Sequence, residues 1–167
     1  MAGPQFSDVI TLLEPLKPVR PGEPVRLIIP SINVAADVKN VGLNATGAMI
    51  APLNRADVAW LALGARPGES GVAVIAGHYG RLNGRPSVFD NLHKLQPGDL
   101  IVVQDAAAVS YTYTVRLTKI YEPTADAAAV FDSIDGGSHL NLITCGGVWD
   151  ARTKSFTTRM VIFADMS

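Results

Sequence analysis

The spacing of apolar residues constrains the fold of this chain more than any other feature of its sequence. From Val25 onward, short apolar runs alternate with Gly, Pro, Asn and Asp, a pattern typical of an all-β sandwich or barrel. Residues 111–117 place Tyr111, Tyr113, Val115 and Leu117 on one face, which predicts a half-buried strand. Other runs are apolar on both faces, as are strands inside a closed sheet; the clearest are 71–77, 100–103, 140–145 and 160–164.

Helices play a small part in the predicted structure. Segments 56–63 and 87–95 have the length and apolar spacing of short helices. Residues 1–24 carry proline at positions 4, 15, 18, 21 and 24, which disfavours regular structure. The sequence therefore predicts a leader or linker over residues 1–24, with a short helical turn at 8–13, and one folded domain over residues 25–167, a length that suits a single core.

Composition excludes several classes of protein. Hydrophobic residues make up 48% of the chain and charged residues 17%, which indicates a globular domain. The net charge of -1 does not provide the basic field that binds nucleic acid. No apolar run approaches the roughly 20 residues that span a bilayer, and residues 1–24 lack the layout of a secretory signal. A single cysteine rules out an internal disulfide, and the three scattered histidines do not have the spacing of a zinc site.

The single cysteine, Cys145, ends an apolar run and is followed by Gly146 and Gly147. A cysteine in such a run is more often a small buried hydrophobe than a nucleophile. Here the predicted strand ends at the thiol, and the two glycines let the backbone turn away. We therefore expect the sulfur at a rim of the sheet, where backbone N–H groups stabilise a thiolate and a substrate carbonyl can approach.

A proton-transfer partner for Cys145 has to come from one of the three histidines. His139 lies six residues earlier on the same predicted strand, about 20 Å away at about 3.3 Å per residue. His93 has polar neighbours and is expected to be a solvated surface residue. His78 ends the predicted strand 71–77, so two neighbouring strands would bring it and Cys145 to one rim, although without the cysteine a structural histidine would be equally expected.

Arg159 begins the predicted strand 159–164, a separation from Cys145 that suits the return of a hairpin. A guanidinium in an otherwise apolar strand is costly unless it meets an anion or reaches water. An oxyanion formed next to Cys145 would supply that anion. Arg152, in a polar turn, is expected to be solvated.

Three short motifs then occur in the order in which a known enzyme family carries them. They are Ala76-Gly77-His78, Leu142-Ile143-Thr144-Cys145 and Phe156-Thr157-Thr158-Arg159, and together they resemble the sortases, the Gram-positive cell-wall transpeptidases. The likeness runs from about residue 25 to the C-terminus. It includes Pro123-Thr124 followed by Val130, in the long connection that borders the sortase substrate groove.

The resemblance implies a closed eight-stranded β-barrel with one or two short helices and a catalytic site of His78, Cys145 and Arg159. It also implies an LPxTG-like C-terminal sorting signal as substrate, with attack of Cys145 on the Thr carbonyl and protonation of the leaving amine by His78. Arg159 would hydrogen-bond the oxyanion or the substrate backbone. An amine from a cell-wall precursor or a pilin lysine would then resolve the thioester.

The resemblance extends to the surroundings of the site. Ile143 and Thr144 are expected to line the groove beside the nucleophile, and Val130 to border it. Tyr79 and Trp149 are candidate substrate contacts, although an aromatic residue in a loop is at least as often a packing lid. Residues 80–85 form an insertion that we expect to reshape the groove mouth.

The family relation also implies partners and a location. The partners would be the sorting-signal peptide of a surface protein or pilin and the acceptor amine, on the extracytoplasmic face of a membrane, with an N-terminal anchor outside this sequence. No cofactor is expected. Some sortases bind calcium near the loop that here carries Glu122, Asp126, Asp132 and Asp135, but dispersed carboxylates without EF-hand spacing are usually solvated.

Two other interpretations of the same residues stay open. The first is a cysteine peptidase that only hydrolyses, which an added amine would distinguish because no ligated product would form. The second is a non-catalytic β-barrel binding module in which Cys145 belongs to the core, which a thiol inert to alkylation would favour.

Overall fold

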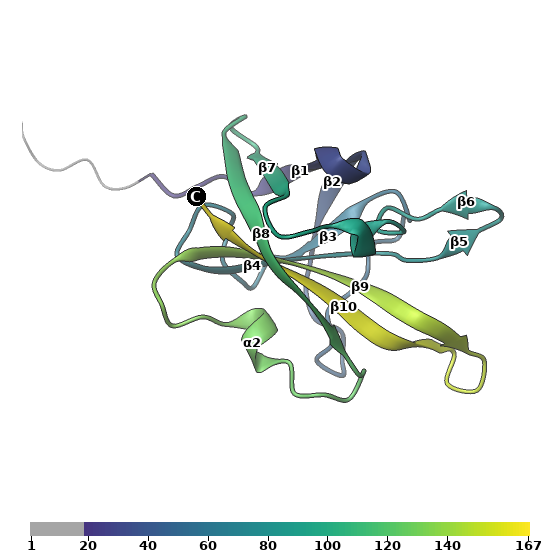
Figure 1. Ribbon diagram of the computed structural model, residues 1–167. Coiled ribbons are helices and arrows are strands. Elements are labelled where there is room, and N and C mark those ends of the chain that lie inside the picture. The colour runs from purple at the N-terminus through teal and green to yellow at the C-terminus, as the bar shows by residue number, and fades with distance from the viewer. Residues whose placement is uncertain (1–18) are drawn as a thin grey trace, which may run out of the picture.

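The computed structural model describes residues 19–167, and strands dominate its regular structure (Figure 1). The predicted helical turn at 8–13 and most of the predicted leader lie outside the described residues. The elements, in chain order, are β1 (Pro24–Ile29), η1 (Pro30–Ile32), β2 (Val34–Val41), β3 (Val58–Leu61), β4 (Gly71–Gly77), β5 (Arg81–Leu82), β6 (Arg85–Pro86), η2 (Leu92–Lys94), β7 (Leu100–Asp105), β8 (Ser110–Tyr121), α2 (Ala128–Phe131), β9 (Ser138–Asp150) and β10 (Ser155–Met166).

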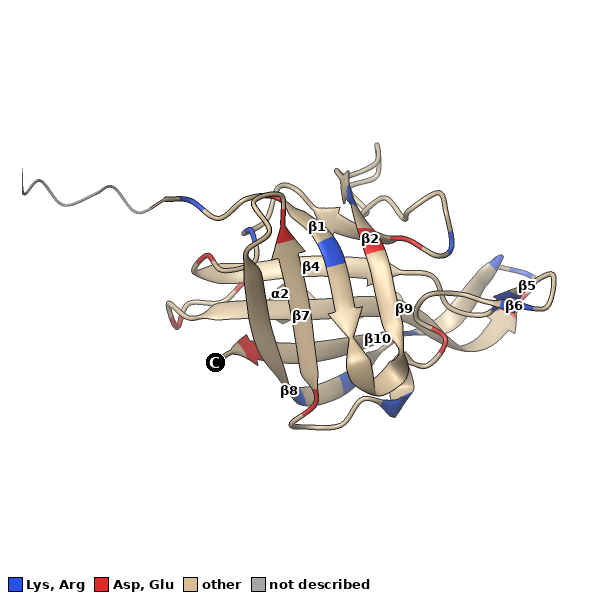
Figure 2. Cartoon of the chain, turned by 90° about the horizontal axis from the view of Figure 1, so that it is seen from above, with Lys and Arg blue, Asp and Glu red and all other residues tan. Residues whose placement is uncertain are grey.

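Eight of these strands close into a barrel in the order β1-β2-β3-β4-β9-β10-β8-β7. The pairs β2–β3 and β4–β9 are parallel, and the other neighbours are antiparallel. β5 and β6 form a separate hairpin that projects from the barrel, as Figure 2 shows from above. The expected all-β fold with a closed eight-stranded barrel is therefore confirmed. None of the helices in residues 19–167 has the length and apolar character needed to cross a bilayer.

Side chains that alternate along the strands fill the barrel. Trp60, Ile75, Tyr113, Leu142 and Ile162 belong to one buried cluster, as the two-residue period of a strand requires. The polar tips of the large aromatic residues find partners, because Tyr113 Oη accepts the backbone N–H of Gly68 at 2.9 Å and Trp60 Nε1 donates to the carbonyl of Ala65 at 3.1 Å. The interior is thus packed and leaves the outer face of the sheet for chemistry.

Two smaller apolar clusters lie on the outer face of the barrel, on either side of β9. One packs Val72 and Val74 of β4 against Leu61 and Met49. The other packs β10 residues against α2 and the end of β8, with members Tyr121, Val130, Val161 and Phe163. Ile143, two residues before Cys145, packs against both clusters. The outer surface that leads to Cys145 therefore has an apolar wall on each side.

The helices predicted over 56–63 and 87–95 are wrong. The first segment contains strand β3, in which all four residues are buried, so its apolar run has no alternation that distinguishes a strand from a buried helix. The second contains only the 3₁₀-helix η2 within a series of tight turns, in which the N–H of Leu92 donates to the carbonyl of Phe89 at 3.1 Å.

One residue of the predicted half-buried strand lies on the other face. In β8 the pairing with β10 passes from Val115↔Ala164 directly to Leu117↔Phe163. Arg116 is thus the extra residue of a β-bulge, which reverses the facing of the residues beyond it. Leu117 is 36% exposed for this reason.

Residues that we predicted to belong to the leader make specific contacts with the barrel. The backbone N–H of Gly22 donates to Asp105 Oδ2 at 2.9 Å, and Arg66 Nη1 donates to the carbonyl of Pro21 at 2.8 Å. The same Asp105 carboxylate accepts the N–H groups of Ala107 and Val109 in the β7–β8 turn. These bonds fix where the chain enters β1.

Candidate active site

His78 and Cys145 lie just beyond the point where the pairing of two neighbouring strands ends. β4 and β9 run parallel, and their pairing ends at Ala76↔Ile143; His78 and Cys145 each follow two residues later. Neighbouring strands are about 4.8 Å apart, and residues two apart share a face. Thr144 Oγ1 donates to the carbonyl of Gly77 at 2.8 Å, which holds the two strand ends together.

Arg159 stands on the other side of Cys145. The two residues are directly paired on the antiparallel strands β9 and β10, and such partners present their side chains on the same face. Ile143 and Val161, two residues away on their strands, belong to the outer clusters. His78, Cys145 and Arg159 therefore share the outer face and one rim of the barrel.

The hydrogen bonding of His78 fixes its tautomer. Its Nε2 lies 2.6 Å from the carbonyl oxygen of Pro52. A carbonyl only accepts hydrogen bonds, so Nε2 carries the proton and the neutral ring leaves a lone pair on Nδ1. Nδ1 has no hydrogen-bond partner among residues 19–167 and is the atom that can exchange a proton.

The guanidinium of Arg159 is held by neutral oxygen atoms. Nη1 donates to the carbonyls of Phe156 and Thr158 at 3.1 Å and 3.0 Å, and Nη2 donates to Ser155 Oγ at 3.0 Å. Within the described part of the chain no carboxylate lies within ion-pair distance of Arg159. Its positive charge is thus fixed in place and not neutralised, which suits a group that meets a developing oxyanion.

Cys145 is a free, partly exposed thiol. It borders a small pocket of about 70 Å³ lined by Tyr79, Phe89, His93, Thr144, Cys145, Gly146, Gly147 and Met160. Just beyond the thiol, Gly147 has φ = +74°, and a Cβ there would lie 2.3 Å from Thr157 Oγ1. Only glycine fits at this position. The strand does not end at the thiol, as we had predicted, but continues to Asp150, with an irregularity in its pairing with β10 between Phe156 and Thr158.

Three of the five predicted substrate-contact residues are accessible. Ile143 is partly exposed between the two outer clusters. Tyr79 lines the pocket of Cys145. Trp149 is 54% exposed on the extension of β9. All three lie along the surface that a peptide bound at Cys145 would contact.

Thr144 and Val130 offer a ligand little surface. Thr144 is 4% exposed and uses its hydroxyl to join β9 to β4. Val130 is 1% exposed and packs within the cluster under α2, where the carbonyl of Val130 accepts Asn141 Nδ2 at 2.7 Å. In this structure the two side chains support the site: Thr144 joins β9 to β4, and Val130 packs in the apolar cluster beside β9.

Sequence reasoning missed two residues that shape the site. Phe156 makes edge-on contacts with Tyr79 and Trp149, with ring centroids 5.3 Å and 5.2 Å apart. Arg55 donates from Nη2 to the carbonyl of Tyr79 at 2.8 Å and from Nε to Ser87 Oγ at 2.8 Å, which fixes the loop that follows His78. Phe156 belongs to the motif Phe156-Thr157-Thr158-Arg159, which could have drawn attention to it. Nothing in the turn-rich sequence around Arg55 indicated a hydrogen-bond partner.

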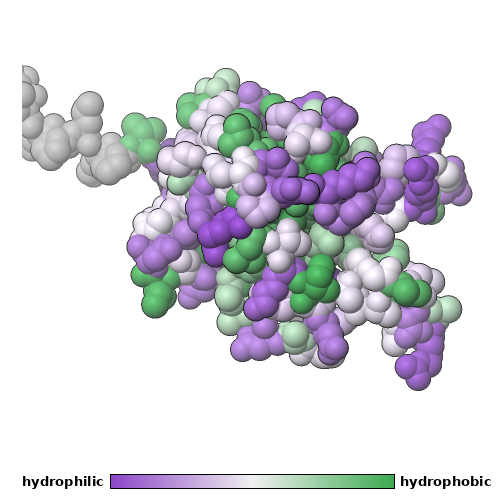
Figure 3. All heavy atoms as spheres, in the orientation of Figure 1, coloured by the Kyte–Doolittle hydropathy of each residue, from purple (hydrophilic) through white to green (hydrophobic). Residues whose placement is uncertain are grey.

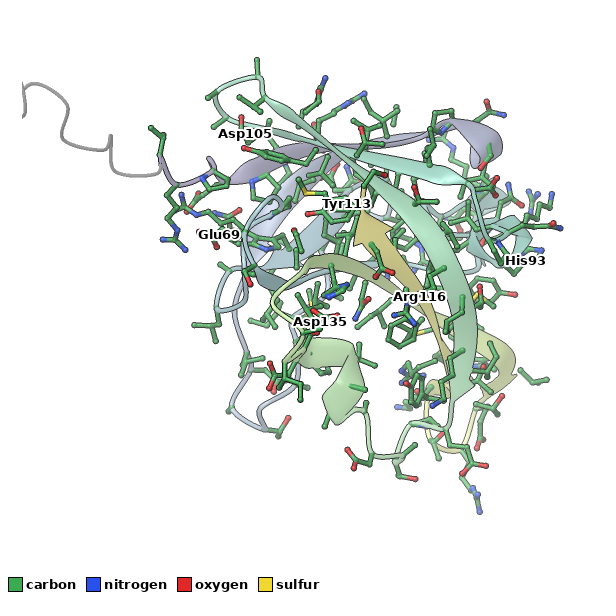
Figure 4. All side chains as sticks on the ribbon, turned by 60° about the vertical axis from the view of Figure 1, so that its left-hand side comes forward. Glu69, His93, Asp105, Tyr113, Arg116 and Asp135 are labelled. Atoms are coloured by element: carbon green, nitrogen blue, oxygen red, sulfur yellow. The ribbon has the colours of Figure 1, made fainter. Side chains whose placement is uncertain are left out.

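The other two histidines differ in their surroundings. His93 is exposed on η2, yet it lines the pocket of Cys145. His139 lies at the opposite end of β9, where its Nδ1 is 2.7 Å from Asp165 Oδ1 and its Nε2 is 2.7 Å from Asp135 Oδ1. Arg116 Nε completes this cluster at 3.0 Å from Asp165 Oδ2. Figure 4 shows Asp135 and Arg116 near the middle of the view and His93 at its right edge.

The His139 cluster shifts the titration of its members. The hydrogen bond to Asp135 raises the pKa of His139 above its ordinary 6.5, with a further contribution from Asp165. The same bond lowers the pKa of Asp135 from 3.8 to about 2. Since the folded-state pKa of His139 is raised, its stabilising effect is complete below pH 6.5 and is lost as the pH rises through the raised pKa. The contribution of Asp135 is present above pH 3.8 and is lost as the pH falls toward 2.

We therefore expect His139→Gln to lower the melting temperature most in the window from pH 3.8 to 6.5. The difference from the unsubstituted protein should shrink as the pH is raised, which thermal melts across a pH series would measure. His93→Gln, on the exposed η2, is the control and should show no such dependence. A difference for His139→Gln that is constant with pH, or that grows toward alkaline pH, would contradict the cluster's role.

Carboxylates in the loop before β9 bind nearby backbone groups. Asp126, Asp132 and Asp135 accept N–H groups of Ala128, Ser133 and Gly137 respectively, each within 3.0 Å. Among residues 19–167 there is no group of three or more His, Cys, Asp or Glu side chains arranged to hold a metal ion. The structure therefore adds no support for a calcium site here.

Comparisons with known proteins identify the family of the chain. The family model described as the Sortase domain matches residues 27–167. The chain belongs to the sortase family. Membership of this family of cysteine transpeptidases accounts for the barrel fold.

Solved sortase structures share the fold. Sortase C1 of Streptococcus agalactiae superposes with a TM-score of 0.66 at 23% identity, covering 85% of this chain and 66% of that one. Sortase C-1 of Actinomyces oris gives 0.64 at 23% identity, covering 90% and 76%. Sortase C-1 of Streptococcus pneumoniae gives 0.68 at 22% identity, covering 86% and 66%. This sortase thus spans about two thirds of the length of several such structures. No curated protein matches the sequence.

Proposed function

We propose that this sortase cleaves an LPxTG-like C-terminal sorting signal and transfers the new acyl end to an amine. The observation that carries the proposal is the shared rim: parallel pairing aligns His78 with Cys145, and antiparallel pairing sets Arg159 directly opposite Cys145. A nucleophile, a proton carrier and a cation on one face are what acyl transfer requires.

The first half of the reaction forms a thioester. The Cys145 thiolate attacks the threonine carbonyl, and the carbonyl electrons move to oxygen, where the Arg159 guanidinium stabilises the oxyanion. The oxyanion collapses, the C–N bond breaks, and His78 in its protonated form gives a proton from Nδ1 to the leaving amine. The bond from Nε2 to Pro52 keeps the ring in the orientation that presents Nδ1.

The second half reverses these roles. An acceptor amine attacks the thioester, His78 takes its proton at Nδ1, and Cys145 leaves as a thiolate, which restores the starting state. If water attacks instead, the product is a free acid. The acceptor amine would come from a peptidoglycan precursor or a pilin lysine.

The outer face of β9 suits the donor peptide. Ile143 lies between the two apolar clusters just before Cys145, and Tyr79 and Trp149 flank the thiol through their contacts with Phe156. We assign donor contacts to these three accessible side chains. Thr144, which we expected to line the groove, and Val130, which we expected to border it, are almost fully buried, so we assign them supporting roles. Family membership supports an extracytoplasmic location for such a reaction, with the enzyme attached by an N-terminal anchor.

The proposal is tested with a library of sorting-signal peptides, incubated with the enzyme with and without an amine such as triglycine. We expect cleavage after threonine in both cases and a ligated product by mass spectrometry only when the amine is present. Cleavage that yields acid alone at every amine concentration would identify a hydrolase. A native-state thiol that no alkylating reagent modifies, together with no cleavage, would favour the binding module.

A further inference from the structure

A second cavity adjoins the segment that holds His78. It has a volume of about 650 Å³ and lies between the β2–β3 connection and the β5–β6 hairpin. Figure 3 shows this hairpin as a projection with a hydrophilic tip, separated from a second projection below it. We call the cavity the hairpin cleft; it is lined by Leu53, Asn54, Arg55, Ala56, Leu82, Asn83, Arg85 and Pro86.

The hairpin cleft adjoins the proposed proton carrier through two hydrogen bonds. Pro52, which precedes the lining residue Leu53, accepts the bond from His78 Nε2 at 2.6 Å. Arg55, itself in the lining, donates to the carbonyl of Tyr79, the residue after His78. Hydrogen bonds therefore join the wall of the cleft directly to His78 and to the residue after it.

The charge of the hairpin cleft is positive and not neutralised. Its lining contains Arg55 and Arg85 and no acidic residue, and Arg81 stands beside them on β5. Within residues 19–167 none of the three arginines lies within 4.0 Å of a carboxylate oxygen. Figure 2 shows the basic residues of β5 and β6 in blue.

The acidic groups nearest in sequence are engaged elsewhere. Asp90 Oδ1 accepts the N–H of Gly80 at 2.6 Å, and Asp57 Oδ2 lies 4.0 Å from Lys39 Nζ. The cleft also offers apolar surface, since Leu53 is fully exposed and Leu82 is 55% exposed. A ligand that combines carboxylates with an apolar side chain would satisfy both kinds of surface.

We propose that the hairpin cleft binds the acceptor as a peptide segment that carries carboxylates and an apolar residue next to its nucleophilic amine. This inference rests on the proposed transfer reaction. The donor occupies the outer face of β9, so the amine approaches from another side. The hairpin cleft lies beside His78, which must take the amine's proton. The arginines select the acceptor by charge, and Leu53 and Leu82 contact its apolar side chain.

Binding is measured first, on the Cys145→Ala protein, so that it does not depend on turnover. The probe is a short fluorescent peptide with a free glycine amine followed by glutamates and a leucine; the matched peptide has glutamines in place of the glutamates. We expect Arg81→Gln/Arg85→Gln to raise the Kd of the acidic peptide about tenfold and to leave that of the glutamine peptide unchanged. Added salt should weaken only the acidic peptide.

The matched control removes two positive charges that do not line the hairpin cleft. Arg20→Gln/Arg26→Gln alters residues on and just before β1, which pair with Glu69 and Asp37, and should leave the Kd of both peptides unchanged. The cleft assignment is wrong if both double variants weaken the acidic peptide equally, if neither does, or if the glutamine peptide binds as tightly as the acidic one.

Turnover then separates this inference from the proposed function. Donor cleavage without acceptor reports the function, and we expect the same rate for the Arg81→Gln/Arg85→Gln enzyme as for the unsubstituted one. In ligation, the acceptor KM should rise about tenfold for the acidic peptide only. An unsubstituted enzyme that cleaves no donor contradicts the proposed function and the acceptor role, whatever the cleft binds. Normal cleavage with an unchanged acceptor KM contradicts the acceptor role alone.

Discussion

Cys145→Ala should reduce cleavage of a sorting-signal peptide at least about a thousandfold, because without the sulfur no thioester forms and water must attack the amide directly. The residue is partly exposed at the rim of the barrel and lies outside the buried core clusters. Loss of one sulfur atom there should leave the fold intact. The rate is measured by mass-detected peptide cleavage, alongside a thermal melt of the variant.

Met160→Ala is a control for the pocket itself, since Met160 lines the same pocket from β10 but has no nucleophilic group. We expect it to retain cleavage within about tenfold, because it loses only packing. Cleavage by Cys145→Ala at the rate of the unsubstituted protein would remove Cys145 from the mechanism. A variant that is inactive but also unfolded would be replaced by Cys145→Ser, which keeps the size of the side chain.

His78→Gln should lower the cleavage rate by about 10²- to 10⁴-fold, the range attributed to a lost general acid or base. The glutamine amide can still donate a hydrogen bond to the carbonyl of Pro52, as His78 Nε2 does, but it cannot transfer a proton. The loss should therefore appear in kcat, with the donor KM little changed. Steady-state kinetics measure both quantities.

His93→Gln is the matched control for His78. His93 also lines the Cys145 pocket, but it lies on the exposed η2, and we expect its replacement to preserve the rate. If His93→Gln showed the large loss and His78→Gln did not, the roles of the two histidines would have to be exchanged.

The sequence predicted the barrel well because the relevant signal is local. Turn residues between short apolar runs indicate strands whatever their neighbours are. The predicted strand end at Gly77 agrees with β4, whereas the predicted end at Cys145 is wrong, because β9 continues to Asp150. Val58–Leu61 was mistaken for part of a helix because a fully buried strand has no alternation to identify it. The bulge at Arg116 depends on pairing between β8 and β10, which no single strand reveals.

The supporting residues of the site could not be predicted for the same reason. The bond from Arg55 to Tyr79 and the pair of carboxylates on His139 join segments that are distant in sequence. Thr144 looked like a groove residue because it adjoins Cys145, yet adjacent residues of a strand face opposite sides, and its hydroxyl binds the carbonyl of Gly77. Alternation from Cys145 would have placed Thr144 inside.

The central claim, that a substrate acyl group is transferred to Cys145 at this rim, is tested most directly by the intact mass of the protein during reaction with a donor peptide. The account predicts a mass increase equal to the acyl part of the peptide, located on Cys145 by digestion and released when an amine is added. Turnover without any such adduct, or an adduct on another residue, would contradict it.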